Sequence, residues 1–145
     1  MWILEIFPNY FMAFPTLGEA YSCQGKHEQA IEWLEKARPQ LPGDFWPTAS
    51  LGSSYVRAGR RCDAERLLAE LMAKRREGRY VSAVAIARVA TALDQLDLAF
   101  DWLETAVTER DPGLLWHVKT DPDLAPVRTD PRHAAILRRM NLATA

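Results

Sequence analysis

Residues 11–44 read FMAFPTLGEAYSCQGKHEQAIEWLEKARPQLPGD, and their pattern returns when the chain is shifted by 34 residues. The shift places Leu17-Gly18 on Leu51-Gly52. The other identities in this register are Pro8 with Pro42, Tyr21 with Tyr55, Gly25 with Gly59, Ala30 with Ala64 and Leu34 with Leu68. Each identity alone has odds of roughly one in ten to one in twenty from ordinary residue usage, so the set is not a coincidence. A period of this length predicts a protein built from repeated supersecondary units.

Each unit is predicted to contain two amphipathic helices. The apolar residues recur at three- and four-residue spacing, which places them on one stripe of a helix. In the first unit these residues are Phe14, Leu17 and Tyr21, followed by Ala30, Leu34 and Ala37. Both helices therefore have one face to bury.

Small residues occupy the positions where the two helices of a unit would cross or turn. Gly18 and Ala30 allow the paired helices to approach each other closely. Gly25 and Gly59 lie between the helices, where a residue with positive φ is expected. Asp94 takes that place in the third unit, and aspartate tolerates the left-handed conformation better than most residues.

The repeat resembles the tetratricopeptide (TPR) family, whose pattern is an aromatic residue, Leu-Gly, Tyr, Ala, a large apolar residue, Ala and Pro at fixed offsets. The first unit matches at every position: Phe14, Leu17, Gly18, Tyr21, Ala30, Leu34, Ala37 and Pro42. The second departs from the pattern at Thr48, Leu71 and Arg76, and the third has Ala90 in place of Tyr. The resemblance implies an all-α fold: a right-handed α-solenoid of about three TPR helix-turn-helix repeats with a C-terminal capping helix.

We expect five segments along the chain. Residues 1–10 are interpreted as the remnant of a preceding repeat, because Pro8 occupies the closing-proline position. The three repeats are placed at 11–44, 45–79 and 80–112, and a capping segment at 113–145. Helix pairs are expected near 11–39, 45–77 and 80–109, and a short helix near 131–140.

The capping segment contains three Asp-Pro pairs, at residues 111–112, 121–122 and 130–131. Each offers a helix N-cap followed by a proline at the first helical position. The last helix should cover the third repeat with Ala135, Ile136 and Met140. This segment also resembles the closing part of TPR regions in large bacterial regulators, which implies that the chain belongs to a larger bacterial protein.

The first residues of the chain are strongly apolar and include Trp2, Ile3, Phe7 and Phe11. Solenoids cap their ends with polar faces, so an uncapped apolar edge predicts self-association, docking on a partner, or a longer protein. No basic residue precedes Lys26, which argues against a signal peptide. With two isolated cysteines and no CxxC motif, the chain is expected to be cytoplasmic, without a membrane span.

The sequence offers no catalytic constellation, and we expect no enzymatic activity, no cofactor and no metal site. His27-Glu28 opens like a zinc-protease motif, but Ile31 stands where the second histidine is required. No phosphate-binding loop or nucleophile elbow occurs. The carboxylates lie on the polar faces of the predicted second helices, where solvated charge is ordinary.

The remaining prediction is a protein-interaction scaffold, in which the first helices of successive repeats line a concave groove for a peptide or helix. The resemblance places eight groove residues: Met12, Glu19, Trp46, Ser53, Arg57, Val81, Val84 and Arg88. An alternative, that several of these only pack between neighbouring helices, has equal weight. Trp46 is the expected apolar anchor, and Arg57 with Arg88 is expected to meet an acidic side chain of the ligand.

A nucleic-acid-binding helical repeat is the alternative function. Its only support is the basic run Lys74-Arg75-Arg76 together with Arg79. The net charge of −1 shows no footprint of a polyanion partner, so nucleic acid is the less favoured partner.

Overall fold

The computed structural model describes residues 13–40 and 46–142, which form helices joined by short turns, with no strand among them. Three helix pairs follow one another, and a segment of short helices closes the chain. The pairs are α2 (Ala13–Cys23) with α3 (His27–Ala37), α4 (Trp46–Arg57) with α5 (Arg61–Arg76), and α6 (Ala83–Ala92) with α7 (Leu96–Glu109). A 3-10 turn, η1 (Arg38–Gln40), extends α3. The prediction of an all-α solenoid is confirmed.

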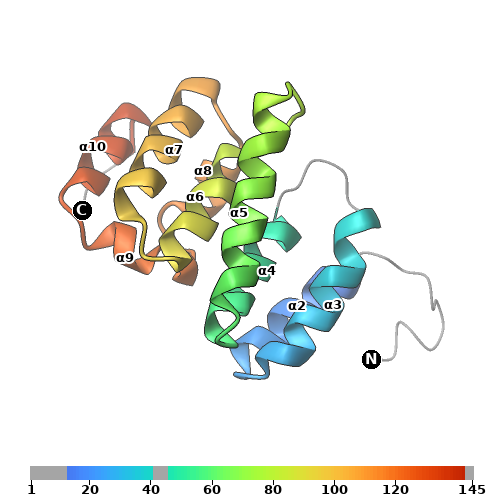
Figure 1. Cartoon of the computed structure of the whole chain (residues 1–145). Helices are drawn as coiled ribbons and strands as arrows, with labels where there is room; N and C mark the ends of the chain where they lie inside the picture. Colours follow the sequence, from blue (N-terminus) through green and yellow to red (C-terminus); the bar gives the residue numbers. More distant parts are fainter. Residues whose placement is uncertain (1–12, 41–45, 143–145) are drawn as a thin grey trace.

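The three pairs stack side by side (Figure 1), so that each pair buries its apolar face against the next. The first helices α2, α4 and α6 are in contact with one another in sequence and form one layer. The second helices α3, α5 and α7 lie on the other side. Helix α4 contacts both its own partner and the helices of the repeats before and after it. The layer of first helices is therefore the one that can line a groove.

The turns within the pairs have the conformation that the sequence predicts. Gly25, Gly59 and Asp94 all have positive φ, at 73°, 76° and 61°. Asn141 at the end of the last helix also has a positive φ, of 57°. The non-glycine residues among these are Asx residues, which tolerate this region because their short polar side chains can bond locally.

The closing segment contains more regular structure than the single helix expected at 131–140. It comprises α8 (Gly113–His117), η2 (Pro122–Leu124), α9 (Ala125–Arg128) and α10 (Arg132–Arg139). The side chains of Asp111, Asp121 and Asp130 each accept a hydrogen bond from the backbone N–H two residues later, at 2.8–2.9 Å. The predicted N-cap role is confirmed for Asp121, whereas the N-cap residues of α8 and α10 are the prolines themselves, Pro112 and Pro131. Each pair still starts a new short element.

The closing segment covers the third repeat, as predicted. Ile136 has no exposed surface and Met140 packs against the same apolar cluster, which also contains Leu103 of α7. Leu124 and Val127, from η2 and α9, are fully buried in it as well. The third pair is thus enclosed on its far side by α8 to α10.

Several predictions concern residues outside the described ranges. These are the repeat remnant at 1–10, the apolar residues up to Phe11, the groove residue Met12 and the closing Pro42. They stay predictions.

Gly52 of α4 lies directly against Val89 of α6. A Cβ atom at this position would lie 2.7 Å from Val89 Cγ2 and 3.3 Å from Val89 Cβ, and Val89 has no exposed surface. Because Val89 is held by the backbone of α6, the clash cannot be relieved by rotating a flexible side-chain end.

We therefore expect Gly52→Ala to lower the free energy of unfolding by about 1 kcal/mol or more in urea denaturation. Overpacking costs about 1–3 kcal/mol, which exceeds the gain of up to about 1 kcal/mol from better helix propensity. Ala69→Gly, at an exposed site of α5, measures the propensity part alone. A Gly52→Ala variant that is more stable than the wild type would contradict the close approach.

Candidate functional site

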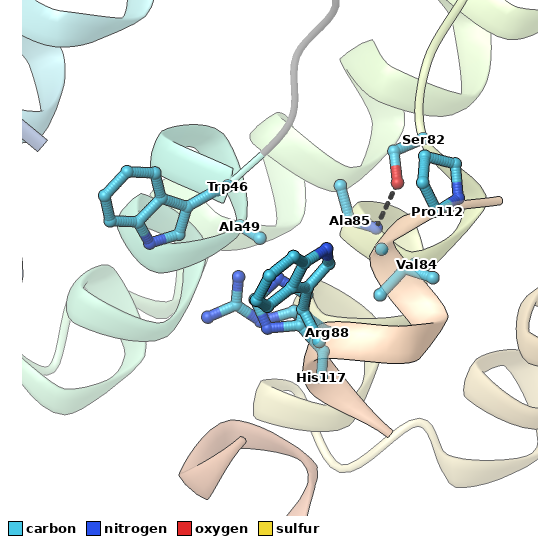
Figure 2. A pocket seen from close by; sticks show the side chains of 10 residues that line it. Trp46, Ala49, Ser82, Val84, Ala85, Arg88, Pro112 and His117 are labelled. Atoms are coloured by element: carbon cyan, nitrogen blue, oxygen red, sulfur yellow. Dashed lines mark hydrogen bonds between the residues drawn. The ribbon is translucent and has the colours of Figure 1, made fainter. Parts of the chain in front are cut away.

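The layer of first helices and the closing segment enclose a hollow with several connected pockets. One pocket has a volume of about 500 Å³ and a second, smaller one about 320 Å³. Trp46, Arg88, Trp116 and His117 line both. Figure 2 shows Trp46 of α4 on one side, Val84 and Pro112 on the other, and Arg88 between them. The groove is therefore made by α2, α4 and α6 together with α8 and η2.

Arg88 lies at the floor of this hollow and is almost completely buried, with 4% of its surface exposed. Its Nη2 donates to Asp123 Oδ2 at 3.0 Å, and its Nε lies 2.9 Å from Asp121 Oδ2. A buried guanidinium needs such partners, because an unpaired charge in the interior costs several kcal/mol. Both partners come from the closing segment, more than thirty residues along the chain.

Asp123 gathers three donors from the first helices. Besides Arg88, Arg57 Nη2 donates to its Oδ1 at 2.6 Å and Ser53 Oγ donates to its Oδ2 at 2.7 Å. Bonds from ionised donors to a carboxylate are about twice as strong as neutral ones. Asp123 therefore holds η2 in the groove against both α4 and α6.

Asp121 combines a local and a long-range role. Its side chain caps η2 and lies 2.7 Å from His117 Nδ1. Burial by itself would raise the pKa of Asp121, but the hydrogen bond with His117 and the charge of Arg88 outweigh it and lower the pKa below the ordinary 3.8. The carboxylate is thus ionised when it faces Arg88.

Glu19 and Trp46 connect α2 with α4 at the other end of the hollow. The indole Nε1 of Trp46 donates to Glu19 Oε1, and Ser50 Oγ donates to the same oxygen at 3.3 Å. The bond from Nε1 holds the edge of the Trp46 ring, and the face of the ring stays available to line the pocket.

The structure brings most of the predicted groove residues together. The connected pockets are lined by Glu19, Trp46, Arg57 and Arg88, and Val84 contributes to the one of about 320 Å³. Ser53 is buried beneath Asp123. Val81 has no exposed surface and belongs to the apolar cluster shared by the three repeats, so it offers no contact to a ligand. Met12 lies outside the described residues.

The sequence reasoning missed the contribution of the closing segment. Arg57 and Arg88 do meet acidic side chains, but these are Asp123 and Asp121 of the same chain. Trp116, which is 77% exposed, was not among the predicted groove residues either. The Asp-Pro pairs were the available signal, although their local role as N-caps does not tell where the segment docks.

The basic run at the end of α5 is largely paired with acidic side chains. Lys74 bridges to Glu70 at 2.9 Å, Arg75 pairs with Glu109, and Arg79 pairs with Glu77 at 2.9 Å. Phosphate contacts require cations that can leave their partners, so this pairing weakens the case for nucleic acid.

Other kinds of site find no support in the described part of the chain. No group of three or more His, Cys, Asp or Glu side chains in residues 13–40 and 46–142 converges to hold a metal ion. None of the helices in these ranges has the length and hydropathy that crossing a membrane requires.

Comparison with known proteins agrees with the repeat pattern. Residues 16–44 match the family model of the tetratricopeptide repeat, so the resemblance stated for the first repeat is confirmed. No curated protein and no solved structure matches the chain.

The lowered pKa of Asp121 leads to a prediction about stability in acid. A carboxylate whose pKa is lower in the folded than in the unfolded chain stabilises the fold above the unfolded value, and this contribution is lost as the pH falls through the folded one. We expect Asp121→Asn to be less stable than the wild type at neutral pH, and the difference to shrink below the ordinary value of 3.8.

Urea denaturation of both proteins across this pH range gives the difference between their free energies of unfolding. The contributions of the other acidic groups are the same in both proteins and cancel in this difference. Asp97→Asn is the matched control, because its ion pair with Arg132 leaves Asp97 94% exposed and should contribute under about 1 kcal/mol. A difference between Asp121→Asn and wild type that is independent of pH would contradict the assigned ion pairs.

Proposed function

We propose that this tetratricopeptide-repeat chain is a protein-interaction module, and that a segment of its partner lies in the groove between Trp46 and Trp116. The observation that carries the proposal is the position of Trp116. Its indole is 77% exposed and lines the same pockets as the half-buried Trp46. The exposed indole beside the hollow is apolar surface that water solvates poorly, so its burial by a partner is favourable.

The shape and chemistry of the hollow support a protein ligand. Two indoles offer large contact areas, and tryptophan is enriched among the residues that dominate binding energy in protein interfaces. Buried polar groups at the floor give such a site orientation and specificity. Helical repeats present this kind of extended concave surface for peptides and helices.

The wider setting is also a proposal. The resemblance of residues 113–145 to the closing part of TPR regions in large bacterial regulators supports a place in a larger, cytoplasmic bacterial regulatory protein. The apolar residues Trp2, Ile3 and Phe7 support a second contact surface, through which copies of the chain self-associate.

A selection from a random peptide library displayed on phage tests the groove without knowledge of the natural partner. We expect Trp46→Ala and Trp116→Ala each to weaken the binding of the selected peptides by about 2 kcal/mol, as for hot-spot residues. Leu115→Ala is the matched control, because Leu115 is the adjacent residue of α8, is 72% exposed and lines none of the described pockets of the groove. Isothermal titration calorimetry gives the affinities.

Urea denaturation of each variant shows whether a loss of affinity reflects a loss of fold. Selected peptides that bind both tryptophan variants as tightly as the wild type would place the site elsewhere. A library from which nothing is enriched on the chain would also contradict the proposal.

A further inference from the structure

Glu19 carries a negative charge that no cation balances within the described part of the chain. Its carboxylate is half-buried on α2 and accepts hydrogen bonds from the Trp46 indole and the Ser50 hydroxyl. Both donors are neutral. The hydrogen bonds orient the carboxylate toward the hollow but leave its charge in place.

The guanidinium groups nearby are already engaged. Arg57 and Arg88 both donate to Asp123, and Arg88 also lies against Asp121. Three carboxylates therefore line the groove with two guanidiniums and the imidazole of His117, which lies against Asp121. Among the described residues, Glu19 is the carboxylate of the three that has no ion-pair partner. The electrostatic field near Glu19 favours a positively charged ligand and opposes a negatively charged one.

The pocket beside Glu19 has the walls that attract an organic cation. Glu19, Trp46 and Trp116 line one pocket of about 500 Å³. The faces of indole rings attract ammonium and guanidinium groups, and tryptophan does so more strongly than other aromatic residues. Long basic side chains also bury their methylene groups against such rings.

We propose that this pocket binds a lysine or arginine side chain of the partner protein, with Glu19 as its counter-charge and the two indoles as its walls. The inference rests on the proposed function of the groove and specifies the chemistry of the residue that enters it. It replaces the acidic ligand residue that the sequence suggested for Arg57 and Arg88.

Arg88 supplies a second point of recognition. Its Nη1 is buried and has no hydrogen-bond partner among the described residues, although Arg88 lines the same pocket. A buried donor without an acceptor costs free energy that a ligand can recover. A main-chain carbonyl of the partner, next to its basic residue, provides a neutral acceptor for this N–H.

An acidic ligand residue is disfavoured by the same contacts. At Arg88 it would have to compete with Asp123, which already has three donors from α4 and α6. At Arg57, whose side chain is 42% exposed, it would share a guanidinium that already donates to Asp123. It would also come close to Glu19 without a cation to screen it. The groove thus selects against acidic segments by like-charge repulsion.

The experiment uses the full chain and peptides selected from a random library displayed on phage. We expect the enriched peptides to share a lysine or arginine, and we expect Glu19→Gln to lower their affinity about tenfold. Glutamine keeps an oxygen that accepts from Trp46 and Ser50, so the variant removes the charge and retains the local hydrogen bonds. Asp101→Asn is the control, since Asp101 is an exposed carboxylate on α7 and its removal changes the net charge equally.

The outcomes separate the inference from the proposed function. A shared basic residue whose binding falls with Glu19→Gln and with Trp116→Ala, but not with Asp101→Asn, supports the inference. Peptides that share an acidic residue and depend on Arg57, or uncharged peptides that bind Glu19→Gln unchanged, overturn it while the groove remains the site. Peptides whose affinity is unchanged by the substitutions at Trp46, Trp116 and Glu19 overturn both the inference and the proposed function.

Discussion

The burial of Arg88 is the constraint on which the arrangement of this solenoid depends. A guanidinium with 4% of its surface exposed requires negative partners, and α6 itself supplies none. They come from Asp121 and Asp123, which must reach back from the closing segment to the layer of first helices. One buried charge therefore decides where residues 113–128 lie and encloses the groove on the side of the third repeat.

The groove that results differs from a bare row of first helices. The closing segment places Trp116 in the same pockets as Trp46 and adds two carboxylates next to Arg57 and Arg88. It thereby supplies carboxylate partners for both guanidiniums and leaves Glu19 without an ion-pair partner among the described residues. The same segment that completes the core of the third pair also sets the chemistry of the ligand.

The repeat and its turns could be predicted from the sequence because they depend on local rules. The identity of Leu51-Gly52 with Leu17-Gly18 located the helix pairs, and the positive φ of Asp94 follows from its place in the period. The N-cap role of Asp121 and the side-chain bonds of Asp111 and Asp130 to nearby backbone N–H groups are equally local. Gly52 illustrates the limit of this reasoning, since its conflict with Val89 involves a helix of the next repeat.

The candidate site could be predicted only in part. Glu19, Trp46, Arg57 and Arg88 lie in the groove because the repeat places them there. The contact of Asp123 with Arg88 could not be foreseen, because the two residues are 35 positions apart in the sequence. The irregular turns between them determine where Asp123 lies, and no local rule predicts the path of those turns. Trp116 lies on a helix of five residues, which is too short for its periodicity to reveal an exposed face.

The measurement that tests this account most directly is a double-mutant cycle between Arg88 and Asp123. The free energies of unfolding of Arg88→Met, Asp123→Ala and the double variant are compared with that of the wild type in urea. If the closing segment is held in the groove by this pair, the coupling energy is about 2 kcal/mol, within the range for residues in direct contact. Effects that add within about 0.5 kcal/mol, as expected for independent sites, would show that the segment is held by other contacts and would contradict the account.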